Sequence, residues 1–191
     1  RVLYVENTGV RNPRMGDMGR IRRRISSWRK NLQGFREERK NLYIYSPLLL
    51  PFPYSRPARR INRWLLLSAL RRWMETMEFY RPVCWTFLPT PLTLDLIHGI
   101  PHQLLVYYCI DSFADSTPAA QRIVPSEQQM FREADLVFVT SHQLKEEASR
   151  HSKQVHLFPF GVSLRTFQQA AAVSNGLPPE IARCKRPIIG Y

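Results

Sequence analysis

The chain has 191 residues, 44% of them apolar and 23% charged, a composition typical of a globular domain and unlike that of a disordered or fibrous chain. The net charge of +13 is uneven, because residues 1–82 contain 19 Lys and Arg against 6 Asp and Glu, whereas residues 83–191 contain 9 of each. The basic part suits a phosphate-rich partner, namely nucleic acid, anionic lipid head groups or a pyrophosphate-bearing substrate; a merely solvated surface is the alternative.

The amino-terminal part begins with a short apolar run at residues 2–5, which predicts a buried strand. Apolar residues at 18, 21, 25, 28 and 32 then recur at spacings of three and four, which predicts an amphipathic helix that Asp17 caps and Gly34 ends. Its basic face is either solvated or in contact with an anionic membrane, and both alternatives stay open. The residues of this face are Arg20, Arg22, Arg23, Arg24, Arg29 and Lys30, with Trp28 near its boundary.

Three further elements are predicted before residue 80. Residues 41–45 form a strand, and residues 46–54 form an apolar loop with three prolines that either lines a binding site or covers the core. Residues 59–77 form a helix that is apolar nearly all round in its middle, which favours burial over a position at a membrane interface.

The middle of the chain contains a predicted βαβ unit. Residues 104–110 and 135–140 are apolar without alternation, as in strands buried on both faces, and residues 126–133 supply the crossover helix. Asp111 and Ser112 follow the first of these strands, at the edge of the sheet where ligands of open α/β proteins bind. Asp111 is therefore the best candidate for chemistry; the alternative is that it caps the next helix or orders the following loop.

The remaining pattern extends this unit in both directions. Strands are predicted at 83–88, at 155–158 and at the carboxyl end, with helices at 92–98, 141–151 and 163–172. About six parallel strands alternating with helices predict an α/β protein with a Rossmann-like, doubly wound, mostly parallel sheet.

Neither cofactor nor metal is expected. The chain lacks GxGxxG and GxxxxGK[ST] motifs, so neither dinucleotide binding nor a P-loop is predicted. Cys84, Cys109 and Cys184 are odd in number and have no CxxC spacing, which indicates free thiols in a reducing compartment. His98 and His102 are separated by a glycine and a proline that break any helix able to bring both to one metal.

Four segments, in this order and spacing, resemble the amino-terminal domain of GT-B glycosyltransferases. The likeness is greatest to the retaining families grouped with family 4, and to the teichuronic-acid type within them. The segments are WTFLP at 85–89, YYCID at 107–111, ADLVFVTS at 134–141 and PFGV at 159–162, followed by Phe167. The chain departs from the family in its NGVD-like turn, where Phe160 and Ser163 replace Asn and Asp.

This resemblance implies a domain at residues 1–186 that holds the acceptor, and the start of a nucleotide-sugar domain at 187–191. The family's first strand and its whole second domain would be missing, so the fragment alone should be inactive. The implied activity is transfer of a sugar from a nucleotide-diphospho-sugar, held mainly by the missing domain, to a polysaccharide, lipid-linked or other glycan acceptor. Asp111 would be catalytic, and substrate would contact Asn7, Pro89, Thr90, Ser112, Ser141, Phe160 and Gly161.

The expected location is the cytoplasm, with peripheral attachment to the inner face of the plasma membrane as a further hypothesis. An alternative function is a non-catalytic basic α/β module that binds nucleic acid or another polyanion. Because no RNP-like, KH-like or helix-turn-helix pattern accompanies the arginines, nucleic acid is not the expected partner.

The membrane hypothesis gives a first prediction. Reversing Arg22, Arg23 and Arg29 to Glu should release the protein from acidic vesicles in a sedimentation assay at about 0.15 M salt, since each basic residue near the surface contributes on the order of 1 kcal/mol. The apolar stripe is unchanged, so the variant should fold. Unchanged vesicle binding, or a wild type that never binds, would assign the charge to the acceptor or to solubility.

Overall fold

The computed structural model describes residues 1–6, 34–47, 49–50, 52, 55–114, 117–172 and 183–185. The chain divides into two compact units, residues 1–159 and 160–191. The second unit contains the helix α7 (Leu164–Ala172), which confirms the helix predicted at 163–172. The predicted basic helix at 17–32, Asn7 and the expected boundary at residue 186 lie outside the described residues.

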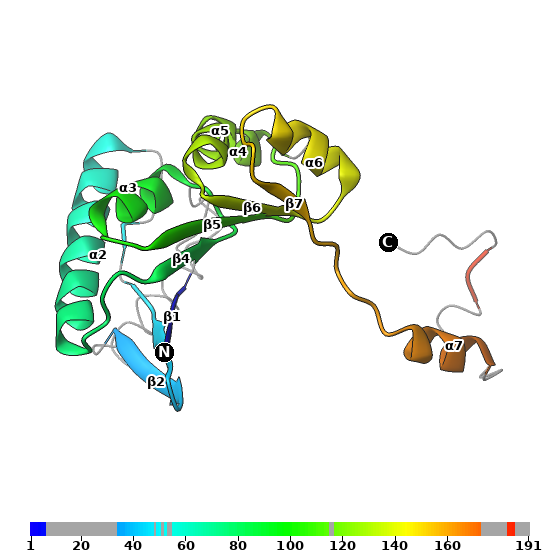
Figure 1. The fold of residues 1–191 in the computed structure, drawn as a ribbon, viewed down its shortest axis with the longest axis horizontal. Helices are drawn as coiled ribbons and strands as arrows, with labels where there is room; N and C mark the ends of the chain where they lie inside the picture. Colours follow the sequence, from blue (N-terminus) through cyan, green and yellow to red (C-terminus); the bar gives the residue numbers. More distant parts are fainter. Residues whose placement is uncertain are drawn as a thin grey trace. The chain divides into compact units, whose positions relative to one another are not determined.

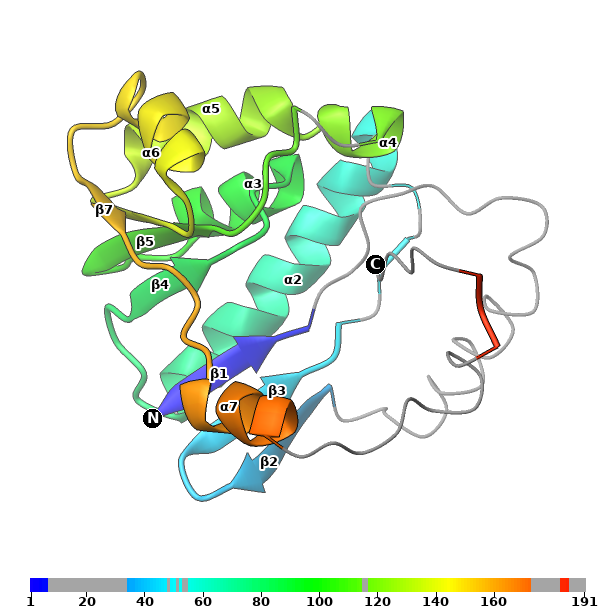
Figure 2. The ribbon, with the colours of Figure 1, turned by 90° about the vertical axis from the view of Figure 1, so that its right-hand side faces the viewer.

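The first unit, whose elements are labelled in Figure 1, begins with a three-stranded sheet in the order β1-β3-β2 (Figure 2). Its strands are β1 (Val2–Val5), β2 (Phe35–Arg39) and β3 (Leu42–Tyr45). The predicted strands β1 and β3 are confirmed and pair in parallel, whereas β2 was not predicted and pairs with β3 antiparallel. The predicted burial of β1 was wrong, because Val2 and Tyr4 are exposed. Asn41 makes the turn between β2 and β3 with φ of 67°, a left-handed conformation that Asn tolerates better than most residues.

A second sheet contains four strands, all parallel, in the order β4-β5-β6-β7. The strands are β4 (Val83–Thr86), β5 (Leu104–Cys109), β6 (Leu136–Val139) and β7 (Val155–Leu157). The helices between them are α3 (Pro91–Gly99), α4 (Pro118–Gln121), α5 (Val124–Glu133) and α6 (His142–Ser149). The predicted βαβ unit is confirmed, and this α/β arrangement is compatible with a Rossmann-like fold.

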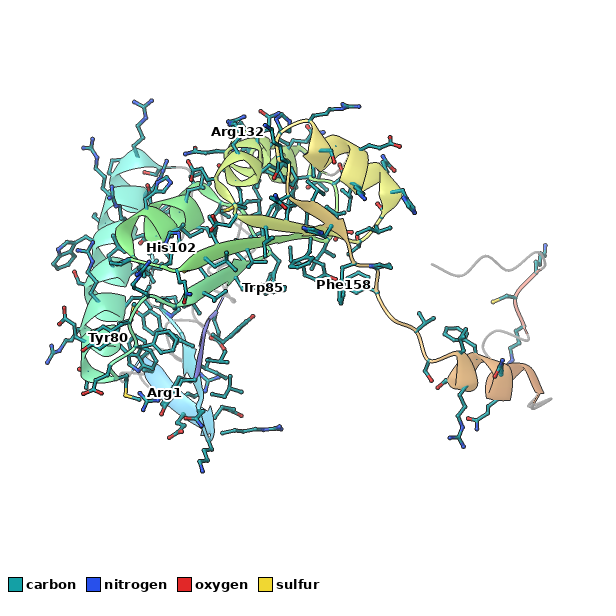
Figure 3. All side chains as sticks on the ribbon, viewed as in Figure 1. Arg1, Tyr80, Trp85, His102, Arg132 and Phe158 are labelled. Carbon is teal, nitrogen blue, oxygen red and sulfur yellow. The ribbon has the colours of Figure 1, made fainter. Side chains whose placement is uncertain are left out.

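Helices α3, α5 and α6 cover one face of the four-stranded sheet (Figure 2). Leu105, Tyr107 and Cys109 of β5 point into this layer and are fully buried, with apolar side chains of β6 beside them. The other face carries aromatic side chains, among them Trp85, which is 55% exposed, and Phe158, which is 63% exposed (Figure 3). Within the described part of the chain, helices therefore pack on one face of this sheet.

Helix α2 (Arg56–Thr76) packs on the three-stranded sheet and on α3. Leu66 and Leu70 contact the core cluster that includes Tyr45, whereas Trp64 is 68% exposed and Leu65 is also exposed. The prediction that this helix is buried was therefore wrong for one face, because only one stripe of α2 meets the sheet. No helix in the described ranges has the length and apolar content needed to cross a bilayer.

A buried asparagine joins α2 to the apolar loop before it. The Asn62 side chain is 2% exposed; its Oδ1 accepts a hydrogen bond from the Leu50 N–H at 2.8 Å, and its Nδ2 donates to the Leu50 carbonyl at 3.0 Å. Leu49 packs against the core, while Leu50 and Phe52 are exposed. The described part of this loop thus both covers the core and presents apolar side chains.

We expect Asn62→Leu to lower the free energy of unfolding by roughly 1–3 kcal/mol, because it leaves the Leu50 N–H and carbonyl without partners. Denaturant unfolding of the purified protein measures this change. The matched control is Arg63→Ala at the next, exposed position, which should stay within about 0.5 kcal/mol of the wild type. Equal stability of the two variants would show that the pair of hydrogen bonds contributes nothing.

Candidate functional site

The carboxyl ends of β4, β5 and β6 meet at one edge of the sheet, because these strands are parallel. The chain leaves β4 through Pro89 and Thr90 into α3, leaves β5 through Asp111 and Ser112, and leaves β6 through Ser141 into α6. Five of the eight predicted catalytic and substrate-binding residues therefore follow neighbouring strands at this edge.

Asp111 is exposed, and the backbone around it is held by hydrogen bonds at the ends of two strands. The Thr140 hydroxyl donates to the Ile110 carbonyl at 2.8 Å, which joins the residue after β6 to the residue after β5. The Cys109 thiol lies 3.7 Å from the Asp111 carbonyl oxygen and donates to it. The carboxylate thus projects from a fixed backbone into solvent at the carboxyl edge.

Two of the other predicted residues, Thr90 and Ser141, cap helices at this edge. Thr90 caps α3, since its hydroxyl oxygen accepts the Thr93 N–H at 3.1 Å, and Ser141 caps α6 by accepting the Leu144 N–H at 3.2 Å. Pro89 is fully buried. Ser112 is half-buried.

A buried polar network lies behind β5, and it was not predicted from the sequence. The Tyr107 hydroxyl donates to Glu127 Oε1 at 2.6 Å, and the Cys109 thiol is 3.7 Å from the same oxygen. Glu127 is 4% exposed, and burial raises the pKa of its carboxyl, an effect that nearby Glu147 reinforces and the Tyr107 hydrogen bond opposes. Burial also raises the pKa of the Cys109 thiol to about 12, so this thiol is protonated at neutral pH.

A signal for Glu127 was present in the sequence. It falls on the same helical stripe as Ile123, Met130 and Phe131, which are all buried. A carboxylate on an apolar stripe needs a hydrogen-bond donor in the core. The sequence alone does not show which donor that is, because Tyr107 is 20 residues away in the chain.

Of the remaining predicted contacts, Phe160 and Gly161 belong to the second unit, and Asn7 lies outside the described residues. Phe160 is 62% exposed. A Cβ added at Gly161 would meet no atom within 4 Å, so a side chain fits at this position without rearrangement.

Histidine and cysteine side chains in the described ranges form no cluster of three or more metal-ligating groups with Asp or Glu. His98 Nε2 lies 2.6 Å from Glu133 Oε2, and His102 Nδ1 lies 2.9 Å from the Ile100 carbonyl oxygen. Cys109 is buried and Cys84 is half-buried, as expected for thiols on apolar strands, whereas Cys184 is exposed.

Comparison with known proteins yields neither a matching family model nor a significantly similar curated protein. The residues at the carboxyl edge and the fold that positions them therefore carry the functional interpretation. Among the described residues, Asp111 combines an exposed carboxylate with a backbone fixed at the end of the central strand.

Glu127 makes stability depend on pH. Because its pKa is raised above the ordinary value of 4.5, the folded chain binds more protons than the unfolded chain between 4.5 and the raised value. The contribution of Glu127 to the free energy of unfolding is therefore fully present below 4.5 and is lost as pH rises through the raised value.

Glu127→Gln should remove this decline, since glutamine keeps an acceptor for Tyr107 but does not titrate. Denaturant unfolding at a series of pH values from about 4 to about 8 measures the difference in slope between the variant and the wild type. Glu146→Gln, on the exposed face of α6, is the control and should keep the wild-type slope. The same slope in wild type and Glu127→Gln would contradict the assignment.

Proposed function

We propose that this chain is the acceptor-side, Rossmann-like domain of a GT-B glycosyltransferase that resembles family 4. Such an enzyme transfers a sugar from a nucleotide-diphospho-sugar to a glycan or lipid-linked acceptor. The observation that carries the proposal is the exposed Asp111 carboxylate on the turn after β5, the central buried strand of a parallel sheet. The order of the four resembling segments along the chain supports it.

The chemistry requires a polar group at the reacting centre. The acceptor hydroxyl oxygen forms a bond to the anomeric carbon while the bond from that carbon to the diphosphate oxygen breaks, and the hydroxyl proton passes to a nearby carboxylate or to the departing diphosphate. A carboxylate near the hydroxyl accepts its hydrogen bond or stabilises the positive charge that develops on the sugar. We assign this role to Asp111, and we assign the nucleotide diphosphate to the second domain that the resemblance implies.

Several arginines of the basic amino-terminal part stabilise the first unit itself, which favours this proposal over a polyanion-binding module. Arg59 donates two hydrogen bonds to Asp95, at 2.5 and 2.8 Å. Arg71 donates to the Gly99 carbonyl at the end of α3, at 2.8 Å. These guanidinium groups are occupied by internal partners, so part of the charge surplus is explained without a nucleic-acid ligand.

Asp111→Asn, introduced into the complete polypeptide that carries this domain, should lower sugar-transfer turnover at least about tenfold, because a positioned carboxylate is lost at the reacting centre. Release of nucleoside diphosphate from a panel of nucleotide-sugars measures turnover, and circular dichroism checks the fold. Glu146→Gln should retain wild-type turnover.

Two results would contradict the proposal in different ways. Near-normal turnover of Asp111→Asn would leave Asp111 a structural residue in an active transferase. Absence of nucleotide-sugar turnover in the wild type, together with salt-dependent RNA binding, would replace the transferase by the polyanion-binding module.

A further inference from the structure

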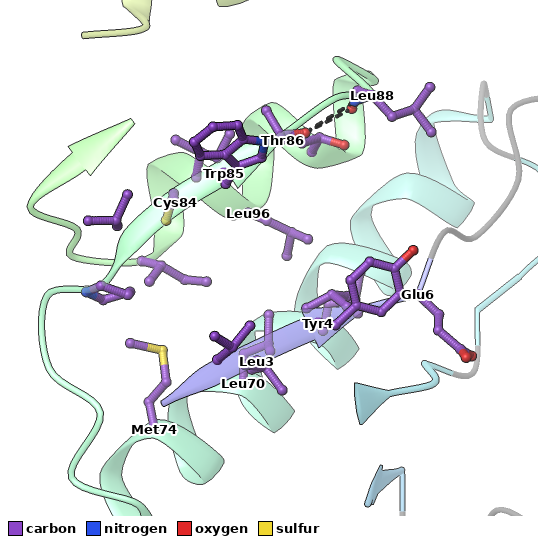
Figure 4. A pocket seen from close by; sticks show the side chains of 18 of the residues that line it. Leu3, Tyr4, Glu6, Leu70, Met74, Cys84, Trp85, Thr86, Leu88 and Leu96 are labelled. Atoms are coloured by element: carbon purple, nitrogen blue, oxygen red, sulfur yellow. Dashed lines mark hydrogen bonds between the residues drawn. The ribbon is translucent and has the colours of Figure 1, made fainter. Parts of the chain in front are cut away.

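A cleft of about 770 Å³ separates β1 from β4 within the first unit (Figure 4). Its sides are residues 1–6 and 82–88, and apolar side chains of α2 and α3 line it, among them Leu66, Leu70, Leu96 and Ile97. A volume of this size suits many small ligands. The backbone along the two sides gives a narrower indication of the occupant.

The cleft side of β1 presents peptide groups with no strand beside them. The Val2 N–H donates to the Asn41 carbonyl at 2.8 Å, and the Glu6 N–H donates to the Tyr45 carbonyl at 2.9 Å, so the even-numbered peptide groups face β3. Peptide groups alternate in direction along a parallel strand. The N–H and carbonyl groups of Leu3 and Val5 therefore point away from β3, toward the cleft.

The same alternation applies to β4. The Pro82 carbonyl accepts the Gln103 N–H at 2.9 Å, on the side of β5. The peptide groups of Val83 and Trp85 consequently point away from β5, toward the cleft. In the described part of the chain β1 and β4 are end strands of their sheets, so neither has a strand partner on this side.

Both edges are suited to pairing. Residue numbers rise in the same direction along β1 and β4 as they border the cleft (Figure 4). Exposed strand edges are commonly protected from pairing by charged residues or proline, yet β1 reads VLYV and β4 reads VCWT, without either. The two unprotected edges run in the same direction on either side of the cleft. Their free-facing N–H and carbonyl groups therefore match the carbonyl and N–H groups of a single strand placed between them.

We propose that this cleft binds one extended polypeptide strand that runs parallel to β1 and β4 and hydrogen-bonds to both. The strand would join the two sheets into one, in the order β2-β3-β1-strand-β4-β5-β6-β7. It would span about four or five residues, at roughly 3.3 Å per residue, to match the edges. Its side chains on the helix side would be apolar, because they would meet Leu70 and Leu96. This proposal is independent of the transferase activity.

The probe is a soluble peptide with alternating valine and threonine between terminal lysines, added to the ¹⁵N-labelled chain. Binding should slow amide hydrogen exchange at least about tenfold at Leu3, Val5, Val83 and Trp85. The amides of Tyr4 and Cys84, which face β3 and β5, should change little. Protection confined to α2 and α3, or to other strands, would overturn the proposal.

Backbone-methylated peptides test whether both edges take part. In a strand between two neighbours, the valine amides face one neighbour and the threonine amides face the other. N-methylation of either set should therefore weaken binding at least about tenfold, because it removes the donors to one edge. If methylation of one set leaves binding unchanged, the peptide pairs with a single edge. If methylation of either set leaves binding unchanged, the peptide contacts only the apolar surface of the cleft. Each result would overturn the proposal.

A pair of proline variants completes the test. Val83→Pro removes a donor that faces the cleft without breaking a bond to β5, and it should weaken peptide binding. Val155→Pro makes the same change on the outer edge of β7. The Phe158 N–H donates to the Val139 carbonyl of β6, and peptide groups alternate in direction, so the Val155 N–H, three positions earlier, points away from β6. This control should bind like the wild type. Equal binding by both variants, or protection that appears only with dimer formation, would refute a peptide strand as the occupant.

Discussion

The burial of β5 is the constraint on which the rest of the first unit depends. This strand has neighbours on both edges, and Leu105, Tyr107 and Cys109 are at most 2% exposed. Burying one large apolar side chain such as Leu105 stabilises a fold by about 1.5–3 kcal/mol, and Tyr107 and Cys109 are buried on the same strand, so β5 supplies a substantial share of a marginal total. Because parallel neighbours need crossover connections, α3 and the α4–α5 segment must pass over the sheet, and both lie on the face that these side chains occupy.

The same burial creates the polar network behind the site. A tyrosine hydroxyl in the core must have a hydrogen-bond acceptor, and Glu127 supplies it from α5. The carboxyl is itself removed from water, so its pKa rises. The hydrogen bond from Tyr107 to Glu127 also joins the helix layer to β5, the strand that precedes Asp111. The position of the candidate site and the packing of the core therefore depend on the same few residues.

Much of this fold was predictable from the sequence, and the failures have physical reasons. β5 and β6 read as continuous apolar runs, which identified them as strands, but the full burial on both faces that such runs predict was wrong because the described helices cover one face of the sheet. β2 was missed because Phe35 is its only apolar residue and its strand form depends on pairing with β3. The exposure of Trp64 was missed because periodicity shows how apolar a helix is, but not how much of its surface the neighbouring elements reach.

The sequence predicted where the candidate site lies, but not what each of its residues does. Asp111 lies at the expected edge, yet Thr90 and Ser141, predicted as substrate contacts, are helix caps. Their position before a helix indicates capping as readily as binding. A cap hydroxyl that accepts a backbone N–H has less capacity for a ligand, so recognition at this edge rests more heavily on Asp111 and on the loops beside it.

The cleft between β1 and β4 leads to the same carboxyl edge of the sheet. A strand that entered it in parallel would end where β4 and β5 end, because parallel strands carry their carboxyl termini to one side of a sheet. The segment after that strand would then emerge between Glu6 and Leu88, next to the turn that leads to Pro89. Completing the sheet would thus add a loop to the edge that carries Asp111.

The cleft and Asp111 recognise different chemical groups. Peptide groups along the cleft select an extended backbone of almost any sequence, whereas an exposed carboxylate selects a hydrogen-bond donor or a positive charge. The two features therefore have separate roles: a strand in the cleft would make the sheet continuous, and Asp111 would supply the chemistry at the edge of the sheet.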